Sequence, residues 1–328
     1  MPAVIEHEYP FDPRYGMTLE AMLALEPPPE PVDFEPFWRK TYAEALATPL
    51  ALEDAEPPTQ GAGEGGDFVV RTLKYRGWDG VTLGAWLIAP RSTSPSRFVV
   101  VGHGYYNRPL ADCEPRPGTA ALYISSRGLG LSRQAGISDM TAFHVLHGLA
   151  DRGTYVHRGC AADVWTGVSV LLDLYPEAAG RIEYDGESFG GGIGAMALPW
   201  DRRIAVARLA VPSFGNHPWR LRHACVGSGE AVRMKYAREP AVAETLRYFD
   251  AAVHARRITT PTFCACALFD PAVPPPGQFT VYNAIAGEKE LFVTETGHHE
   301  WLGSAEESRR QREAGDRFVR RHLRLGVD

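Results

Sequence analysis

Apolar residues follow two spacings along this chain, and together they predict strands that alternate with helices. Polar and apolar residues alternate from Asp67 to Tyr75 and from Val81 to Ala89, as in half-buried strands. Gly77-Trp78-Asp79-Gly80 between the two runs favours a tight turn, so an antiparallel hairpin should begin the sheet. Further strands, mostly continuous apolar runs, are predicted at 97–101, 120–125, 181–185, 204–211, 262–269 and 289–294.

Helical periodicity lies between these strands. Cys160–Tyr175 has the 3.6-residue pattern and ends before Pro176, Ile193–Leu198 suits a short buried helix, and Ser304–Leu325 should form a C-terminal helix. Strands that alternate with helices imply a mostly parallel central sheet with helices on both faces. The predicted fold class is therefore α/β.

Two segments should lie outside this alternation. Residues 1–66 are expected to form an N-terminal arm and linker packed on the main domain at 67–328, with helices near Thr18–Leu25 and Phe37–Ala47 and a glycine-rich stretch at Gly61–Gly66. About 50 residues separate the strand at 204–211 from the next, and the insertion within them, at about 212–258, should place roughly two helices over the active site.

Composition narrows the functional classes. The chain has 328 residues, 45% of them hydrophobic, which suits one large α/β domain with additions. A formal charge of −6 argues against nucleic acid or an anionic membrane as partner, and no run of apolar residues is long enough to span a bilayer. The N-terminus lacks the pattern of a signal peptide, and the five cysteines lack metal-ligand spacing. We expect reduced core thiols, a cytoplasmic location, and no metal or cofactor.

The stretch Gly186-Glu187-Ser188-Phe189-Gly190 carries the strongest chemical signal. It follows a predicted strand and precedes a predicted helix, which is the context of a nucleophile elbow with serine at its apex. Gly186 and Gly190 would allow the tight turn, because a β-carbon there would strike the neighbouring strand or helix. The alternative is a glycine-rich turn whose serine is idle.

A second glycine turn, Gly102-His103-Gly104, ends the predicted strand at 97–101. In hydrolases of this architecture the corresponding turn contributes half of an oxyanion hole. The expected donors are the backbone N–H groups of Tyr105 and Phe189. The turn could also serve only to leave the strand.

An acid and a histidine complete the pattern. Asp270 follows the strand at 262–269 and precedes a stiff proline-rich loop, and His298 and His299 follow the last strand. The chain order Ser, Asp, His is that of α/β-hydrolases, which predicts this fold and a serine, histidine and aspartate triad. The pattern does not choose between His298 and His299. The competing acids Asp139, Asp163 and Asp250 are expected on the surface, and Arg127 is either a solvated loop charge or a buried brace.

These motifs resemble the acetyl xylan esterases and cephalosporin C deacetylases, carbohydrate esterase family seven. The resemblance spans most of the chain and includes the segments 34–38, 104–105, 127–128, 186–192, 246–250, 270–275 and 299–300. It implies that the catalytic histidine precedes a glutamate, which selects His299. It also implies that Tyr105 and Phe189 supply the oxyanion hole, that Arg127 with Gly128 braces the site, and that the chain assembles as a homo-oligomer, typically a hexamer.

Three departures from the family pattern stand out. Phe189 and Leu129 occupy positions where the family usually has glutamine, and the segment 107–118 is shorter and lacks the family's aromatic residues. These differences bear on the shape of the acyl pocket, the loop hydrogen bonds and the alcohol subsite.

The sequence thus predicts a serine esterase that removes acetyl groups from small acetylated sugars such as xylo-oligosaccharides, with the acetyl ester of cephalosporin C as a further candidate. The alternatives are a short-chain carboxylesterase of other specificity, a serine peptidase on the same fold, and a catalytically silent hydrolase fold that only binds.

Overall fold

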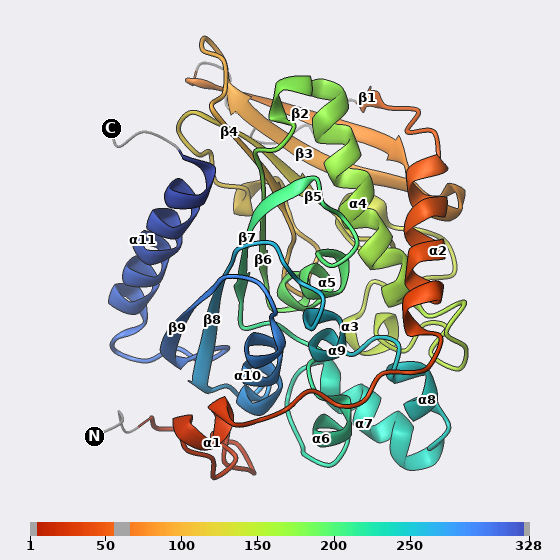
Figure 1. Ribbon diagram of the computed structural model, residues 1–328, viewed down its shortest axis with the longest axis vertical. Coiled ribbons are helices and arrows are strands. Elements are labelled where there is room, and N and C mark those ends of the chain that lie inside the picture. The colour runs from red at the N-terminus through yellow and green to blue at the C-terminus, as the bar shows by residue number, and fades with distance from the viewer. Residues whose placement is uncertain (1–4, 56–65, 325–328) are drawn as a thin grey trace.

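A nine-stranded mixed sheet forms the centre of the molecule (Figure 1). The computed structural model describes residues 5–55 and 66–324, so the predicted linker lies outside the described residues except for Gly66. The strands are β1 (Glu53–Ala55), β2 (Phe68–Arg76), β3 (Thr82–Pro90), β4 (Arg97–Val101), β5 (Thr119–Ile124), β6 (Ile182–Glu187), β7 (Ile204–Ala210), β8 (Thr262–Phe269) and β9 (Lys289–Thr296).

The order of the strands separates an antiparallel part of the sheet from a parallel part. The order is β1-β2-β3-β5-β4-β6-β7-β8-β9, with antiparallel pairs from β1 to β5 and parallel pairs from β5 through β9. The predicted hairpin is β2 and β3, paired in register from Phe68 with Pro90 to Arg76 with Thr82. The α/β-hydrolase architecture predicted from the sequence is confirmed.

Helices cover the two faces unequally. They are α1 (Leu19–Leu23), α2 (Phe34–Ala47), α3 (Thr141–His144), α4 (Val156–Leu174), α5 (Phe189–Ala197), α6 (His217–Arg220), α7 (Ser228–Arg238), α8 (Val242–Leu246), α9 (Ala251–Ala255), α10 (Pro275–Ala284) and α11 (Ser304–Leu323). Helices α4 and α5 pack on one face, with α2 outside α4, whereas α11 lies by itself against β7, β8 and β9 on the other (Figure 1).

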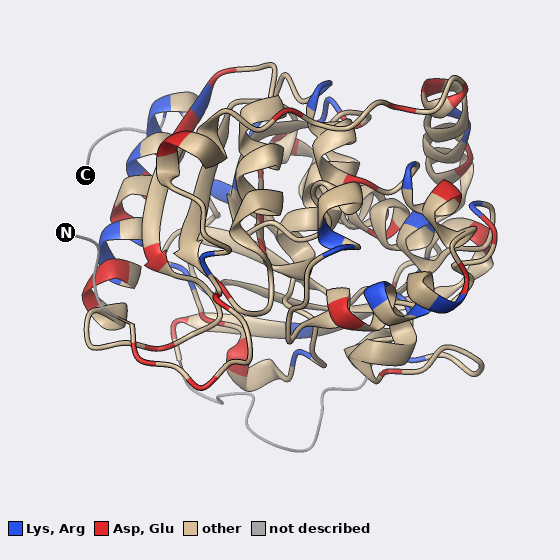
Figure 2. Ribbon diagram, turned by 90° about the horizontal axis from the view of Figure 1, so that it is seen from below, with Lys and Arg blue, Asp and Glu red and all other residues tan. Residues whose placement is uncertain are grey.

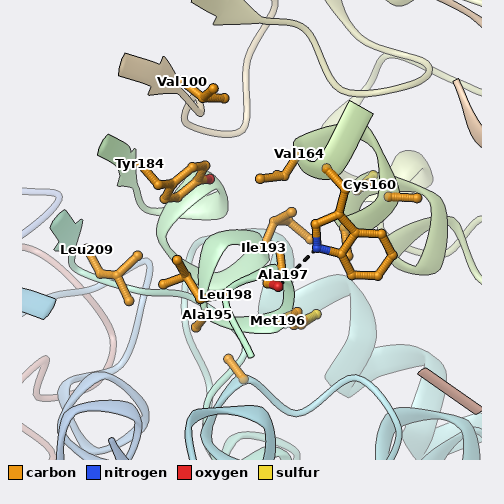
Figure 3. Close-up of a cluster of buried hydrophobic side chains, with 14 of the residues drawn as sticks. Val100, Cys160, Val164, Tyr184, Ile193, Ala195, Met196, Ala197, Leu198 and Leu209 are labelled. Atoms are coloured by element: carbon orange, nitrogen blue, oxygen red, sulfur yellow. Dashed lines mark hydrogen bonds between the residues drawn. The ribbon is translucent and has the colours of Figure 1, made fainter. Parts of the chain in front are cut away.

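The core is densest around α5. Figure 3 shows Tyr184 of β6, Leu209 of β7 and Val164 of α4 around this helix, which contributes Ile193, and all four are at most 1% exposed. Four of the nine residues of α5 are glycine, which is a poor helix former. The helix therefore depends on this tertiary packing, which also fixes the turn at its N-terminus.

The N-terminal segment is part of the main body of the molecule. Strand β1 adds an edge to the sheet, and Trp38 of α2 is fully buried and donates a hydrogen bond from its indole to the carbonyl of Tyr248 at 3.0 Å. Between β7 and β8 the inserted segment forms α6 to α9, more helices than the sequence suggested. Helix α10, which follows the proline-rich loop, had no clear periodic signal.

All five cysteines are buried free thiols. Within residues 5–55 and 66–324, none of the helices combines the length and the apolar character needed to cross a membrane.

Candidate active site

Ser188 lies at the apex of a sharp turn between β6 and α5. Its backbone angles, φ 55° and ψ −114°, are unusual for a residue with a side chain, and such strain is common at functional positions. A β-carbon on Gly186 would lie 2.6 Å from the carbonyl oxygen of Gly190. A β-carbon on Gly190 would lie 2.9 Å from the backbone of Gly102 and His103. Both glycines are thus required by close backbone approaches, and the turn has the geometry of a nucleophile elbow.

His298 connects Ser188 to Asp270. Its Nε2 lies 2.9 Å from the Ser188 hydroxyl, and its Nδ1 lies 2.9 Å and 3.1 Å from the two Asp270 oxygens. Because a buried carboxylate accepts, Nδ1 carries the proton and Nε2 accepts from the serine. This is the arrangement in which histidine can act as a general base.

The choice of His299 from the family resemblance is therefore corrected: His299 turns away from Ser188. Its Nδ1 lies 3.3 Å from the hydroxyl of Tyr9, and its Nε2 lies 3.2 Å from the carbonyl oxygen of Glu6. Consecutive side chains in a turn point in different directions, so only one of the pair can reach the serine. His299 instead contacts the N-terminal segment.

Asp270 is held by donors on every side. It is fully buried and accepts hydrogen bonds from the backbone N–H groups of Ala272 and Val273 at 2.9 Å and 2.8 Å. The side-chain amide of Gln278 donates to it at 2.9 Å. A β-carbon on Gly297 would lie 2.0 Å from Asp270 Oδ2, so the residue before His298 has to be glycine. The acid is fixed before any substrate binds.

Sequence reasoning missed Gln278. This residue of α10 is fully buried, and besides Asp270 it contacts the carbonyl of Val273 at 2.6 Å and the N–H of Ala267 at 2.8 Å. The only sequence signal was a polar residue shortly after the proline-rich loop, which is too common to be specific.

Tyr105 and Phe189 were predicted to supply the backbone N–H groups of an oxyanion hole. Gly190 N–H donates to the carbonyl of His103 at 2.8 Å, which joins the elbow to the turn after β4 and brings Tyr105 near Phe189. Within the described part of the chain, neither the Tyr105 nor the Phe189 N–H donates to a backbone carbonyl or a side chain. Two free donors next to a serine hydroxyl are what an oxyanion hole requires.

A chain of hydrogen bonds supports the Tyr105 side of this arrangement. The Tyr105 hydroxyl contacts His144 Nδ1 at 2.6 Å, and His144 Nε2 donates to the carbonyl of Arg127 at 2.9 Å. Arg127 is buried and pairs with Asp163, donating from its Nη2 at 2.7 Å and from its backbone N–H at 2.8 Å. Gly128, with φ +83°, packs against His144. Arg127 is thus a buried residue, and no sequence signal indicated His144.

The expectation that the competing acids lie on the surface is wrong for two of them. Asp163 is 1% exposed because it pairs with Arg127, and Asp250 is 1% exposed because it accepts three backbone N–H groups near α9. Burial raises the pKa of Asp250 to about 6 although these donors oppose the rise. Asp139 is partly exposed and pairs with Arg133.

Phe189 does not line the cavity above Ser188. Its side chain is 1% exposed and packs in an aromatic cluster, with its ring centre 4.3 Å from Tyr105, 5.6 Å from His103 and 5.9 Å from both His157 and Phe214. The apolar residue in place of the family's glutamine therefore fills the core behind the oxyanion hole. Leu129 is likewise fully buried.

The cavity that contains Ser188 and His298 has a volume of about 360 Å³. Tyr106 and Thr141 form one wall, Ala272 and Val273 another, and Gly227 and Ser228 at the start of α7 close it from the inserted segment. This volume suits a small ester group.

Two carboxylates set the electrostatics of His298. Burial alone would lower the pKa of its imidazole, but Asp270, through charge and hydrogen bonding, and Glu187, through charge, raise it above the usual value. Both carboxylates stabilise an imidazolium at this position, which is the form that exists after the serine proton is removed.

Comparisons with known proteins show which proteins this chain is similar to. The model of the family described as acetyl xylan esterase (AXE1) matches residues 15–313. An acetyl esterase, Axe7A, from Xylanibacter ruminicola is 23% identical over 290 residues, which cover 84% of this chain and 64% of that protein. The chain thus spans about two thirds of the length of this relative.

Two solved structures are similar over nearly the whole chain. The acetyl xylan esterase from Paenibacillus sp. R4 is 25% identical with a TM-score of 0.72, and covers 93% of this chain and 100% of its own. Acetyl xylan esterase 1 from Thermoanaerobacterium sp. JW/SL YS485 is 20% identical with a TM-score of 0.75, and covers 97% and 100%. The second likeness supports the fold alone.

Proposed function

We propose that this chain, which belongs to the acetyl xylan esterase family, is a serine esterase. It removes acetyl groups from acetylated sugars such as xylo-oligosaccharides. The observation that carries the proposal is the hydrogen-bonded series from Ser188 through His298 to Asp270, placed beside two free backbone N–H groups.

Acylation follows from the positions of these groups. Ser188 Oγ attacks the acetyl carbonyl while His298 Nε2 takes its proton, and Asp270 stabilises the imidazolium. The carbonyl oxygen, now negative, is held by the N–H groups of Tyr105 and Phe189. His298 then gives its proton to the departing sugar hydroxyl, which leaves an acetyl group on Ser188.

Deacylation reverses these roles with water as the nucleophile. His298 removes a proton from the water, the same two N–H groups hold the second oxyanion, and acetate leaves as Ser188 regains its proton.

The test is a panel of esters with the wild type and Ser188→Ala. Hydrolysis of 4-nitrophenyl acetate should exceed that of the butyrate and octanoate, acetate should be released from acetylated xylo-oligosaccharides, and Ser188→Ala should lose on the order of 10⁴-fold or more of kcat. Faster hydrolysis of longer acyl chains would instead favour a carboxylesterase of other specificity. Cleavage of peptide amides at rates comparable to those for esters would favour a peptidase. No hydrolysis of any of these substrates would favour a binding protein.

The same proposal includes a further substrate, an oligomeric state and a location in the cell. The acetyl ester of cephalosporin C presents the same bond and is a further candidate substrate. A homo-oligomer, typically a hexamer, is implied by the family resemblance and would be tested by light scattering during gel filtration. The five buried free thiols support a reducing location such as the cytoplasm.

A further inference from the structure

A second, larger cavity begins beside the nucleophile and runs along the sheet face next to α11. It has a volume of about 540 Å³, and Glu187 contributes to its wall and also to the wall of the cavity that contains Ser188. A third cavity, of about 370 Å³, shares His298 with the Ser188 cavity and shares Ser308 and Gln311 with the second one. We call the second cavity the α11 cleft. It adjoins the reacting position both through Glu187 and around the His298 loop.

The cleft exists because helices cover only part of this face of the sheet. The connection from β4 to β5 contains no α-helix, only a single 3-10 turn at Leu110–Asp112, and α11 packs mainly against β7, β8 and β9. Parallel sheets are normally covered on both faces. Between the β4–β5 connection and α11, the strands face a space that is lined by polar groups.

Charged side chains form the floor of the cleft. Asp185 lines the cleft and pairs with Arg116 and Arg208, each at 2.8 Å. Glu183 of β6 is fully buried behind this lining and pairs with Arg97 and Arg208, also at 2.8 Å. Burial alone would raise the pKa of Asp185, but Arg208 and Arg116 lower it to about 2. These ions stay charged, and such a floor favours a polar occupant over an apolar one.

The balance of charge in the lining indicates what kind of polar ligand the cleft binds. Five arginines and four carboxylates line the cleft, so it has nearly equal numbers of charged donors and acceptors. Within the described residues, Arg116 Nη1 and Arg97 Nε are buried without a hydrogen-bond partner. A ligand with many neutral hydroxyl groups both donates and accepts, and it suits this lining better than an anion or a cation.

Helix α11 supplies the opposite wall with four polar side chains. Ser308, Gln311, Arg312 and Asp316 stand at positions i, i+3, i+4 and i+8, so they lie on the same side of the helix. The buried residues Ala314, Phe318 and Val319 pack toward the sheet beside them. Acidic and basic residues both occur along this helix, which is the one that leads to the C-terminus in Figure 2.

We propose that the α11 cleft binds the neighbouring sugar units of an acetylated oligosaccharide while the acetyl group lies at Ser188. The inference rests on the proposed deacetylase function and assigns it a substrate class: chains of several sugar units are preferred over single sugars. Its volume lies within the range of pockets that bind small ligands.

The test compares acetylated xylotetraose with acetylated xylose. In the wild type, kcat/KM should be at least about tenfold higher for the longer substrate, since a few hydrogen bonds to charged groups suffice for that difference. Gln311→Trp, which fills the cleft, and Arg312→Ala, which removes a donor, should each lower this ratio toward one by raising KM for the tetraose. Arg309→Ala is the matched control, because Arg309 lies on α11 outside the cleft and pairs with Glu306 and Glu313.

A ratio near one in the wild type, or a ratio that both cleft variants leave unchanged, would overturn the proposal. If the wild type hydrolyses neither sugar ester, the deacetylase function fails separately. The cleft is then judged by calorimetry with unacetylated xylotetraose and Ser188→Ala: binding that Gln311→Trp abolishes supports the cleft, and absence of binding contradicts it.

Discussion

One peptide unit separates the histidine that reaches Ser188 from the histidine that contacts Tyr9. The sequence places both after the last strand, and the difference lies in the torsion angles of a turn that accommodates Gly297 against Asp270. The family resemblance selected His299 because Glu300 follows it. Only the position of the side chains in space identifies His298.

The pH dependence of activity tests the charges around His298. Its pKa is raised by Asp270 and Glu187, and the protonated imidazole cannot act as a base, so kcat/KM should fall as the pH decreases through a value above that of a free imidazole. Glu187→Gln removes one of the two negative charges and should move this acid limb to lower pH. Rates with 4-nitrophenyl acetate from about pH 5 to 9 would measure the shift. An unmoved or upward-shifted limb would contradict the assignment.

Phe189 should contribute to the stability of the fold and not to the choice of acyl group. Because its ring is buried behind the oxyanion hole and does not line the cavity, Phe189→Ala should cost about 3–5 kcal/mol in the free energy of unfolding. The milder Phe189→Leu should keep the preference for acetate over butyrate. Urea unfolding and the ratio of the two rates would test this. A changed acyl preference with unchanged stability would show that the side chain contacts substrate.

At the scale of elements, the elbow and the turn after β4 meet at Gly190. Gly190→Ala would insert a methyl group 2.9 Å from backbone atoms of Gly102 and His103, and it should push the two oxyanion donors apart. We expect kcat to fall about 10²- to 10³-fold, the usual cost of losing one such donor. Gly66→Ala, where nothing lies within 4 Å of the added carbon, is the control. Equal kcat values for the two variants would contradict this role.

The strands could be predicted because their signals are local. Alternation identified β2 and β3, and buried runs identified β4, β7 and β8 within one or two residues. Helix α10 starts with prolines and has mixed polarity, and the helices of the insertion are short. Their positions depend on tertiary contacts such as those of Asp250, which caps α9 and accepts the N–H groups of Asn216 and His217. Local patterns do not contain that information.

At the scale of the whole molecule, three distant segments meet at Trp38. The indole of this α2 residue packs edge to face on Trp165 of α4 and on Phe249 of the insertion, and it is fully buried. The N-terminal segment therefore stabilises the part of the chain that closes the active-site cavity.

Trp38→Ala should accordingly lower the free energy of unfolding by about 3–5 kcal/mol. Leu46→Ala, at a position of the same helix that is 44% exposed, should change it by less than about 0.5 kcal/mol. Urea titration of both variants provides the measurement. Similar midpoints would mean that α2 is not a structural part of the domain.

The site was predictable to the extent that its residues follow strands. Ser188 and Asp270 occupy strand ends, where the order of the chain identifies them, and the structure brings them together through a histidine. The supports Gln278 and His144 and the α11 cleft arise only when segments far apart in the sequence come together, so no motif indicated them.

The most direct test of the central claim is kcat/KM for 4-nitrophenyl acetate and an acetylated xylo-oligosaccharide with His298→Ala beside His299→Ala. If Ser188, His298 and Asp270 form the catalytic triad, His298→Ala loses on the order of 10⁴-fold or more. His299→Ala, which removes only the contacts to Tyr9 and Glu6, should stay close to the wild type. The reverse result, with both variants folded, would contradict the account.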